Sequence, residues 1–323
     1  MVNYLEARAI PLRSSKGGSV NVQGEPSLTS RAKRAVKVRL RGRVGTGGPP
    51  LPGTDDGLAV LESLASPVED SPILIFSAGW RSGSTLLQRM VISSGSVLVW
   101  GEPYADSLPI QRMMDMLPPL DKRVFKEKWI IGQHRNEGPL VDRFIANLYP
   151  PKESLIEAQR AFIRALFAAP ANDLGYEQWG IKEVRWGIDH ARYMKALFPE
   201  ARLIFLVRNP YDSYASYSGS EWTWNWPDDV VRTAGEFGTK WADLAGGFSD
   251  GAEGLGAVLV RYEDLTKDSG TVVRLQEFLG LEFDQRVLDD NLGLSTRSQL
   301  GATEIKELSR VISPVAEQFG YRP

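Results

Sequence analysis

Residues 73–88 read ILIFSAGWRSGSTLLQ, an apolar run that passes through a Gly/Ser-rich turn into an amphipathic segment. This order predicts a strand, an anion-binding loop and the first turn of a helix. The free backbone N–H groups of a first helical turn, with the helix dipole behind them, attract phosphate or sulfate. Gly79 and Gly83 allow the backbone to approach such a ligand closely, and Arg81 adds a fork of donors.

The loop differs from the phosphate loop of kinases and ATPases, whose pattern is G-x-x-x-x-G-K-[ST]. Gly79 and Gly83 are one residue too close together for that pattern, and Ser84 stands where the lysine belongs. A site for a triphosphate with Mg²⁺ would lack its main cation here. We therefore expect a site for a single phosphate group with an arginine beside it.

The composition is that of an ordinary soluble globular protein. The 323 residues are 42% apolar and 24% charged, and the net charge of −2 does not favour nucleic acid as a partner. No stretch approaches the roughly 20 apolar residues of a membrane span, and no secretory signal is visible, so we expect a cytoplasmic protein. The chain has no cysteine, which excludes disulfides and a catalytic thiol, and only His134 and His190 are present as histidines.

Residues 1–70 are predicted to form a basic N-terminal arm and linker, and residues 71–323 a single domain. Lysines and arginines cluster between residues 31 and 43, and the run GGPPLPG at 47–53 is typical of a linker. A flexible, partly disordered arm is the simplest interpretation. A contact with a partner or a membrane surface and an arm folded onto the body are the alternatives. A short helix at 57–65 is expected at the edge of the domain.

Strands alternate with helices from residue 71 onward, which predicts an α/β fold: a central parallel sheet with helices on both faces. Apolar runs predict strands at 73–77, 97–100, 179–184, 202–207 and 257–262. Periodicity and caps predict helices at 84–94, 152–168, 188–197, 228–245, 269–279 and 303–319, and one that begins at 211. We expect a glycine-rich loop at 246–256 and a break in the last helix, where Ser313 caps and Pro314 starts a new turn.

Five polar residues follow the predicted strands at or just past their carboxyl ends. They are Arg81, Glu102, Lys182, Arg208 and Tyr262. Ligands of parallel sheets bind beyond the carboxyl ends of the strands. We therefore expect these side chains, which come from distant parts of the chain, to line one site.

Two segments resemble the phosphate-binding motifs of the sulfotransferases, which use 3′-phosphoadenosine 5′-phosphosulfate (PAPS). Residues 77–87, with RSGSTLL at their centre, resemble the 5′-phosphosulfate loop, and VRNPYDSYAS at 207–216 resembles the 3′-phosphate segment. VRYEDL at 260–265 and FLGL at 278–281 resemble a later strand and helix of that family. The resemblance covers roughly residues 71–323. It implies the P-loop-like sulfotransferase fold and a PAPS-dependent O-sulfotransferase whose product is adenosine 3′,5′-bisphosphate.

The resemblance also implies which residues hold the nucleotide. They are Arg81, Ser82, Gly83, Ser84, Thr85 and Leu86 for the 5′-phosphosulfate, Arg208 and Ser216 for the 3′-phosphate, and Tyr262, Arg297 and Ser298 nearby. The spacing agrees, since the eight residues from Arg208 to Ser216 are about two helical turns. An arginine fork with a hydroxyl suits a phosphate dianion. The late loop with Arg297 and Ser298 lacks the family's G-x-x-G-x-x-K form.

Glu102 and Lys182 are the expected catalytic residues, together with Arg81. Transfer to a hydroxyl needs a general base. Where small-molecule sulfotransferases have a histidine this chain has Glu102, as the tyrosylprotein-type and several bacterial carbohydrate-type enzymes do. By the same resemblance Lys182 stabilises the leaving group, although Glu183-Val184 follows it where the family often has Asp-Pro. Protein cations stabilise the transfer of an SO₃ group, so no metal is expected.

The acceptor stays open. Trp222, Trp224 and Trp226 alternate, which places three indoles on one side of an extended segment, and in this family that region borders the acceptor pocket. A hydrophobic lid is the alternative interpretation. His134 lies in a variable part of the fold and is a further candidate for substrate contact. A small-molecule or glycan acceptor is expected: a carbohydrate or glycolipid, or a secondary-metabolite phenol or alcohol, ahead of a protein tyrosine.

Two other functions compete with sulfuryl transfer. A phosphoryl-transfer enzyme on the related P-loop fold is disfavoured by the missing Gly-Lys-Ser/Thr sequence. A nucleotide-binding module without catalysis is disfavoured because Arg81, Glu102, Lys182 and Arg208 are all present.

Overall fold

The computed structural model describes residues 54–66, 68–104, 108–117, 148–219, 225–226, 229–284, 286–289 and 299–323. The predicted site residues His134, Trp222, Trp224, Arg297 and Ser298 lie outside these ranges, as do residues 1–53 of the predicted arm. The boundary between arm and domain after residue 70 stays a prediction.

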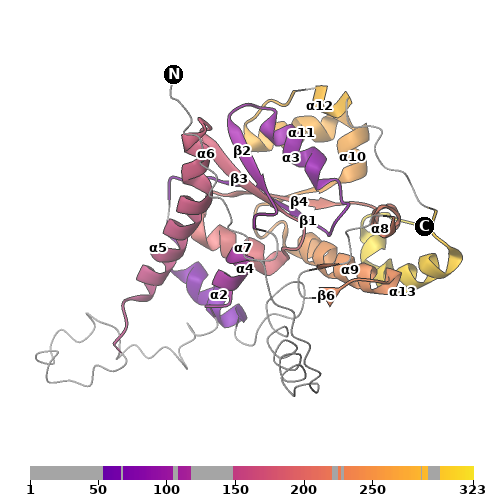
Figure 1. Cartoon of the computed structure of the whole chain (residues 1–323), viewed down its shortest axis with the longest axis horizontal. Helices are drawn as coiled ribbons and strands as arrows, with labels where there is room; N and C mark the ends of the chain where they lie inside the picture. Colours follow the sequence, from indigo (N-terminus) through magenta and orange to yellow (C-terminus); the bar gives the residue numbers. More distant parts are fainter. Residues whose placement is uncertain are drawn as a thin grey trace, which may run out of the picture. The chain divides into compact units, whose positions relative to one another are not determined.

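A five-stranded sheet stands at the centre of the described part of the chain (Figure 1). Its strands in spatial order are β2 (Val97–Gly101), β3 (Gln178–Glu183), β1 (Ile73–Ser77), β4 (Arg202–Val207) and β7 (Val258–Arg261). Every neighbouring pair in this sheet is parallel. The predicted parallel α/β fold is therefore confirmed. A separate antiparallel pair joins β5 (Asn225–Trp226) and β6 (Asp229–Val230).

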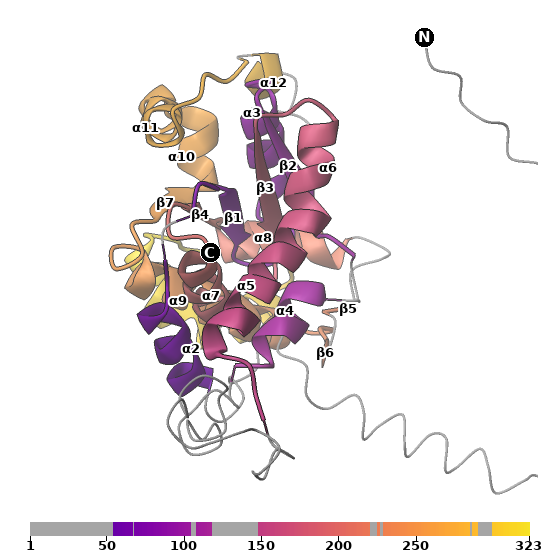
Figure 2. The ribbon, with the colours of Figure 1, turned by 90° about the vertical axis from the view of Figure 1, so that its left-hand side faces the viewer.

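Helices cover both faces of the sheet. Successive side chains of strand β1 point to opposite faces, and both sets are apolar and buried, so each face needs a helical layer. Leu74 and Phe76 belong to one core, with side chains from α7 (Ile188–Leu197), α9 (Ala234–Gly251) and α13 (Ala302–Gln318). Ile73 and Ile75 belong to a second core, with side chains from α3 (Ser84–Ile92) and α11 (Ser269–Leu279). Figures 1 and 2 show α3 and α11 on one side of the sheet and α7 and α9 on the other.

Further helices extend these layers. They are α2 (Thr54–Ser63), α4 (Pro109–Met114), α5 (Lys152–Ile163), a π-helical turn η5 (Arg164–Ala168), α6 (Ala169–Asp173), α8 (Pro210–Ser218), α10 (Tyr262–Lys267) and α12 (Arg286–Asp289). The helix α2 corresponds to the short helix expected at 57–65, and it packs against α7. Its Leu58 and Leu61 are fully buried in the larger core.

The predicted bounds of four elements match those of the structure. The strands at 73–77 and 202–207 and the helices at 188–197 and 269–279 have the expected ends. Their signals are local, for example the left-handed Gly280, with φ of 64°, that ends α11. The segment predicted as a helix at 152–168 continues through the π-helical turn to Asp173.

Three predicted details in the last third of the chain are wrong. The helix α9 begins at residue 234 rather than 228, because Thr233 and Glu236 form a capping box, and it runs through part of the predicted glycine-rich loop to Gly251. The helix α13 continues through Pro314 without the predicted break. It packs closely on α9, where a Cβ at Gly238 would lie 2.6 Å from Cγ2 of Val311. Packing along this helix pair compensates for the loss of the backbone hydrogen bond that a proline cannot donate.

Candidate active site

The loop between β1 and α3 has a backbone that few residues other than glycine adopt. Gly79, Arg81 and Gly83 all have positive φ, of 83°, 62° and 88°. A Cβ on Gly83 would lie 2.1 Å from Cδ2 of Tyr262, so the aromatic ring fills the space that a side chain would need. The loop is thus held against α10 by a contact that requires glycine at position 83.

The start of α3 presents unpaired donors, as an anion site requires. No described residue accepts a hydrogen bond from the backbone N–H groups of Gly83, Ser84 or Thr85. The hydroxyl of Ser82 is fully buried and also lacks a partner in the described part of the chain. A buried donor without a partner is costly, and an oxyanion at the helix start would satisfy it.

Arg81 joins the two predicted phosphate segments directly. Its Nε donates to Oγ of Ser216, on α8, at 2.8 Å. Its carbonyl accepts from Nη1 of Arg208, at the end of β4, at 2.7 Å. Arg208 is only 8% exposed, its guanidinium lies 4.6 Å from the centre of the Tyr262 ring, and its Nε has no partner among the described residues. Arg208 and Ser216 lie 127 and 135 positions after Arg81 in the sequence, and the three residues form one cluster.

Glu102 and Lys182 form a second cluster at the ends of β2 and β3. These strands pair in register at Gly101 and Lys182, and the N–H of Glu102 donates to the carbonyl of Lys182 at 2.8 Å. Nζ of Lys182 lies 2.5 Å from Oε1 of Glu102. The lysine side chain is 6% exposed and the glutamate side chain 34% exposed. The ion pair thus presents a reachable carboxylate over a buried cation.

The backbone of Glu102 is itself unusual. Its φ is 36°, a left-handed value that costs an ordinary residue about 1–2 kcal/mol. Tyr104, two residues later, also has a positive φ, of 61°, and 59% of its surface is exposed. Strain of this kind persists where the surrounding structure imposes it and is typical of functional sites.

A buried ion pair that our sequence analysis did not predict follows Lys182. Arg185 donates from Nε and Nη2 to the two carboxylate oxygens of Glu183, both at 2.7 Å, and both side chains are almost fully buried. The N–H of Val184 donates to the same carboxylate, and its carbonyl accepts from the N–H of Gly79 at 3.2 Å. This pair therefore fixes the chain just past Lys182 and connects β3 to the anion loop. The sequence signal that could have predicted this ion pair is the presence of opposite charges, Glu183 and Arg185, two residues apart at the end of a predicted strand.

The described part of the chain thus gathers predicted site residues into two clusters, one around Arg81 and one at Glu102 and Lys182. Ser82, Gly83 and Ser84 lie in the loop and first turn, whereas the side chain of Leu86 is buried in the core with α11. Thr85 is exposed in the first turn of α3.

No cluster of three or more potential metal-ligating side chains occurs in the ranges that the structure describes. No helix among the described residues is long and apolar enough to cross a membrane.

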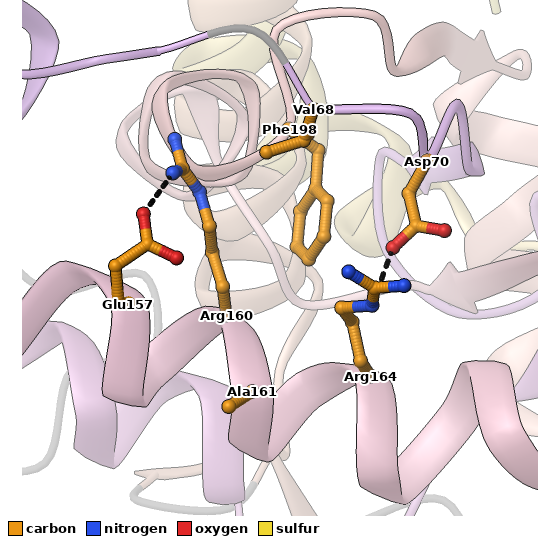
Figure 3. Close-up of a pocket in the computed structure, with 7 residues that line it drawn as sticks. All are labelled: Val68, Asp70, Glu157, Arg160, Ala161, Arg164 and Phe198. Atoms are coloured by element: carbon orange, nitrogen blue, oxygen red, sulfur yellow. Dashed lines mark hydrogen bonds and ion pairs between the residues drawn. The ribbon is translucent and has the colours of Figure 1, made fainter.

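A cavity of about 350 Å³ is lined by none of the residues of the Arg81 cluster or the Glu102–Lys182 pair (Figure 3). Asp70 and Phe198 on its wall precede β1 and β4, so it lies toward the amino ends of the strands. Arg160 on its wall is a structural residue, because its guanidinium donates to Leu197, Ser66 and Glu157. Arg164 pairs with Asp70 at 2.9 Å.

Comparisons with known proteins identify the family of this chain. The model of the sulfotransferase family matches residues 72–285, and the chain belongs to this family. It is therefore an enzyme of sulfuryl transfer. No curated protein matched the sequence at a significant level.

Solved structures of sulfotransferases are similar at low identity. The sulfotransferase domain from the curacin biosynthetic pathway is 17% identical, with 80% of this chain and 99% of that chain covered and a TM-score of 0.44. The domain from the Synechococcus PCC 7002 olefin synthase is 19% identical, with 80% and 98% covered and a TM-score of 0.44. The sulfotransferase STF9 from Mycobacterium avium is 14% identical, with 84% and 82% covered and a TM-score of 0.43.

Proposed function

We propose that this sulfotransferase takes its sulfuryl group from PAPS and transfers it to an acceptor hydroxyl, with Glu102 as the general base. The observation that carries this proposal is the Arg81 cluster. Arg81 donates to Ser216 through Nε and accepts from Arg208 through its carbonyl, so the loop after β1 contacts the segment at 207–216. A nucleotide with phosphates at both its 5′ and 3′ positions is the ligand that such a double site suits.

The residues present fit this nucleotide. The N–H groups at the start of α3 and the buried hydroxyl of Ser82 lack partners in the described ranges and would hold the 5′-phosphosulfate. Arg208 Nε is buried and lacks a partner there as well, and with Ser216 it would hold the 3′-phosphate. When bound, PAPS supplies an SO₃ group on a phosphate leaving group.

Glu102 and Lys182 divide the remaining work. As an acceptor hydroxyl oxygen bonds to sulfur and the bond from sulfur to the 5′-phosphate oxygen breaks, the hydroxyl proton would pass to the partly exposed carboxylate of Glu102. Lys182 places a buried cation beside the reacting centre, where it stabilises charge that develops on the leaving oxygen. The Glu183–Arg185 pair, one and three residues further along the chain, keeps the backbone of this lysine in position.

The acceptor is proposed from the sequence alone, as a carbohydrate or glycolipid or a secondary-metabolite alcohol or phenol. Tyr104 adds an exposed aromatic ring two residues from Glu102, on which a sugar or an aryl group can stack. Trp222, Trp224 and His134 stay predicted contacts.

Calorimetric titration without Mg²⁺ tests the donor. Adenosine 3′,5′-bisphosphate is expected to bind, and Arg208→Ala to weaken it about 10- to 100-fold, the loss of one or two charged hydrogen bonds. Arg192→Ala is the matched control, because Arg192 forms ion pairs with Glu62 and Asp55 on α2 instead. Preferential binding of ATP with Mg²⁺ would contradict the proposal and favour phosphoryl transfer.

A further inference from the structure

The peptide group between Arg208 and Asn209 is fixed at both of its polar ends by distant side chains. Its carbonyl accepts a hydrogen bond from the indole Nε1 of Trp241, on α9, at 3.1 Å. Its N–H donates to Oε1 of Glu263, on α10, at 2.9 Å. A peptide group is planar, so two such anchors set its orientation. The Cα atom that carries the Arg208 side chain directly precedes this peptide group.

Both anchors contact Tyr321, which follows α13. The phenol donates to the second carboxylate oxygen of Glu263 at 2.8 Å. The tyrosine ring packs at a steep angle of 64° on the ring of Trp241, with 6.2 Å between the ring centres. Tyr321 is 5% exposed, and burial together with the Glu263 carboxylate raises its pKa, so the phenol keeps its proton and remains a donor. One side chain thus supports both anchors.

These contacts exceed what the start of α8 needs. The side chain of Asn209 already caps this helix by accepting from the N–H of Tyr211 at 2.9 Å. The anchors from Trp241 and Glu263 act two peptides earlier, on the peptide that directly follows the Cα of Arg208. Arg208 must reach both the Arg81 carbonyl and the face of the Tyr262 ring, and Tyr262 precedes Glu263 on the same helix.

We propose that Glu263 and Tyr321 are positioning residues for the 3′-phosphate clamp. They hold the Arg208–Asn209 peptide so that the Arg208 guanidinium stays between Arg81 and Tyr262, ready for the phosphate. This inference rests on the proposed binding of a nucleotide with a 3′-phosphate. It assigns a binding role to residues that touch no substrate, and it predicts an effect specific to the 3′-phosphate.

The test compares adenosine 3′,5′-bisphosphate with adenosine 5′-monophosphate, which lacks the 3′-phosphate, by calorimetry on the full chain. Tyr321→Phe removes the phenol hydroxyl, and Glu263→Gln removes the carboxylate charge. Each is expected to weaken the bisphosphate about tenfold and to change the affinity for the monophosphate by no more than about twofold. Tyr193→Phe is the matched control, because its buried phenol donates to Gln159 away from this segment. It should alter only the melting temperature.

The outcomes are separable. If the unchanged protein prefers the bisphosphate and both variants keep the full preference, Glu263 and Tyr321 are structural only and the inference is overturned. Equal weakening of both nucleotides in the two variants overturns it as well. If the unchanged protein binds both nucleotides equally, the assignment of Arg208 to a 3′-phosphate fails, and this inference fails with it.

Discussion

Nζ of Lys182 lies 2.5 Å from Oε1 of Glu102, although the two residues are 80 positions apart in the sequence. The contact arises because β2 and β3 are parallel neighbours with Gly101 and Lys182 in register. The lysine is buried and the glutamate is a third exposed. A change in Glu102 therefore leaves a buried cation without this partner, whereas a change in Lys182 leaves a carboxylate that water can reach.

Glu102→Gln is expected to lower turnover about 10²- to 10⁴-fold, since the amide cannot take the acceptor proton. The affinity for adenosine 3′,5′-bisphosphate should be kept, because Glu102 is not among the residues of the Arg81 cluster. Steady-state kinetics and calorimetry on the same preparation measure both quantities. Glu177→Gln, an exposed carboxylate just before β3, is the control and should change neither. Unchanged turnover in Glu102→Gln would remove this residue from the mechanism.

A double-mutant cycle measures the Glu102–Lys182 pair. We expect Lys182→Met and Glu102→Gln to be non-additive, with a coupling free energy of unfolding of about 0.5–3 kcal/mol, because the two side chains are in direct contact. Urea denaturation of the four proteins gives this value. A coupling of zero would mean that the pair does not persist in solution.

Gly83→Ala should weaken nucleotide binding more strongly than its backbone strain explains. A Cβ at this position, with φ of 88°, would lie 2.1 Å from the Tyr262 ring and push it from beneath Arg208. Gly95→Ala is a matched control: Gly95 has φ of 79°, but a Cβ there would meet nothing within 4 Å. Both variants should lose about 1–2 kcal/mol of stability from strain. Only Gly83→Ala should lose affinity for adenosine 3′,5′-bisphosphate, and equal affinities in the two variants would contradict the role of the ring.

His190 is expected to make the folded state sensitive to mild acid. Burial lowers the pKa of this histidine from 6.5 to about 4, and its ring stacks on Trp186 at 6.0 Å. The unfolded chain protonates near pH 6.5 while the folded chain keeps the imidazole neutral. The contribution to stability is thus fully present above pH 6.5 and is lost as the pH falls toward 4, at most about 3 kcal/mol at ~1.4 kcal/mol per unit.

His190→Phe checks this pH dependence. The variant should lose less stability than the unchanged protein between neutral pH and about pH 5, as measured by urea denaturation at each pH. The other histidine, His134, is present in both proteins and cancels in the comparison. Identical pH slopes for the two proteins would show that His190 is not the group responsible.

The order of elements was predictable from the sequence because its signals are local. The apolar runs of β1 and β4 and the glycine that ends α11 each act within a few residues. The proximity of Arg81 to Arg208 and of Glu102 to Lys182 was predictable for a related reason: parallel strands gather their carboxyl ends at one edge. The continuation of α13 through Pro314 was not, because packing against α9 decides it.

The sequence by itself determined the parallel sheet, the glycine-containing loop after its first strand and the family to which the chain belongs. Only the tertiary structure decided which side chains touch. It placed Arg81 in contact with both Ser216 and Arg208 and paired Lys182 with Glu102. It also brought Tyr321 to Glu263, which holds the Arg208–Asn209 peptide. The physical reason is that such contacts depend on strand order and register and on helix packing, which join residues from separate parts of the chain and leave no periodic trace in the sequence.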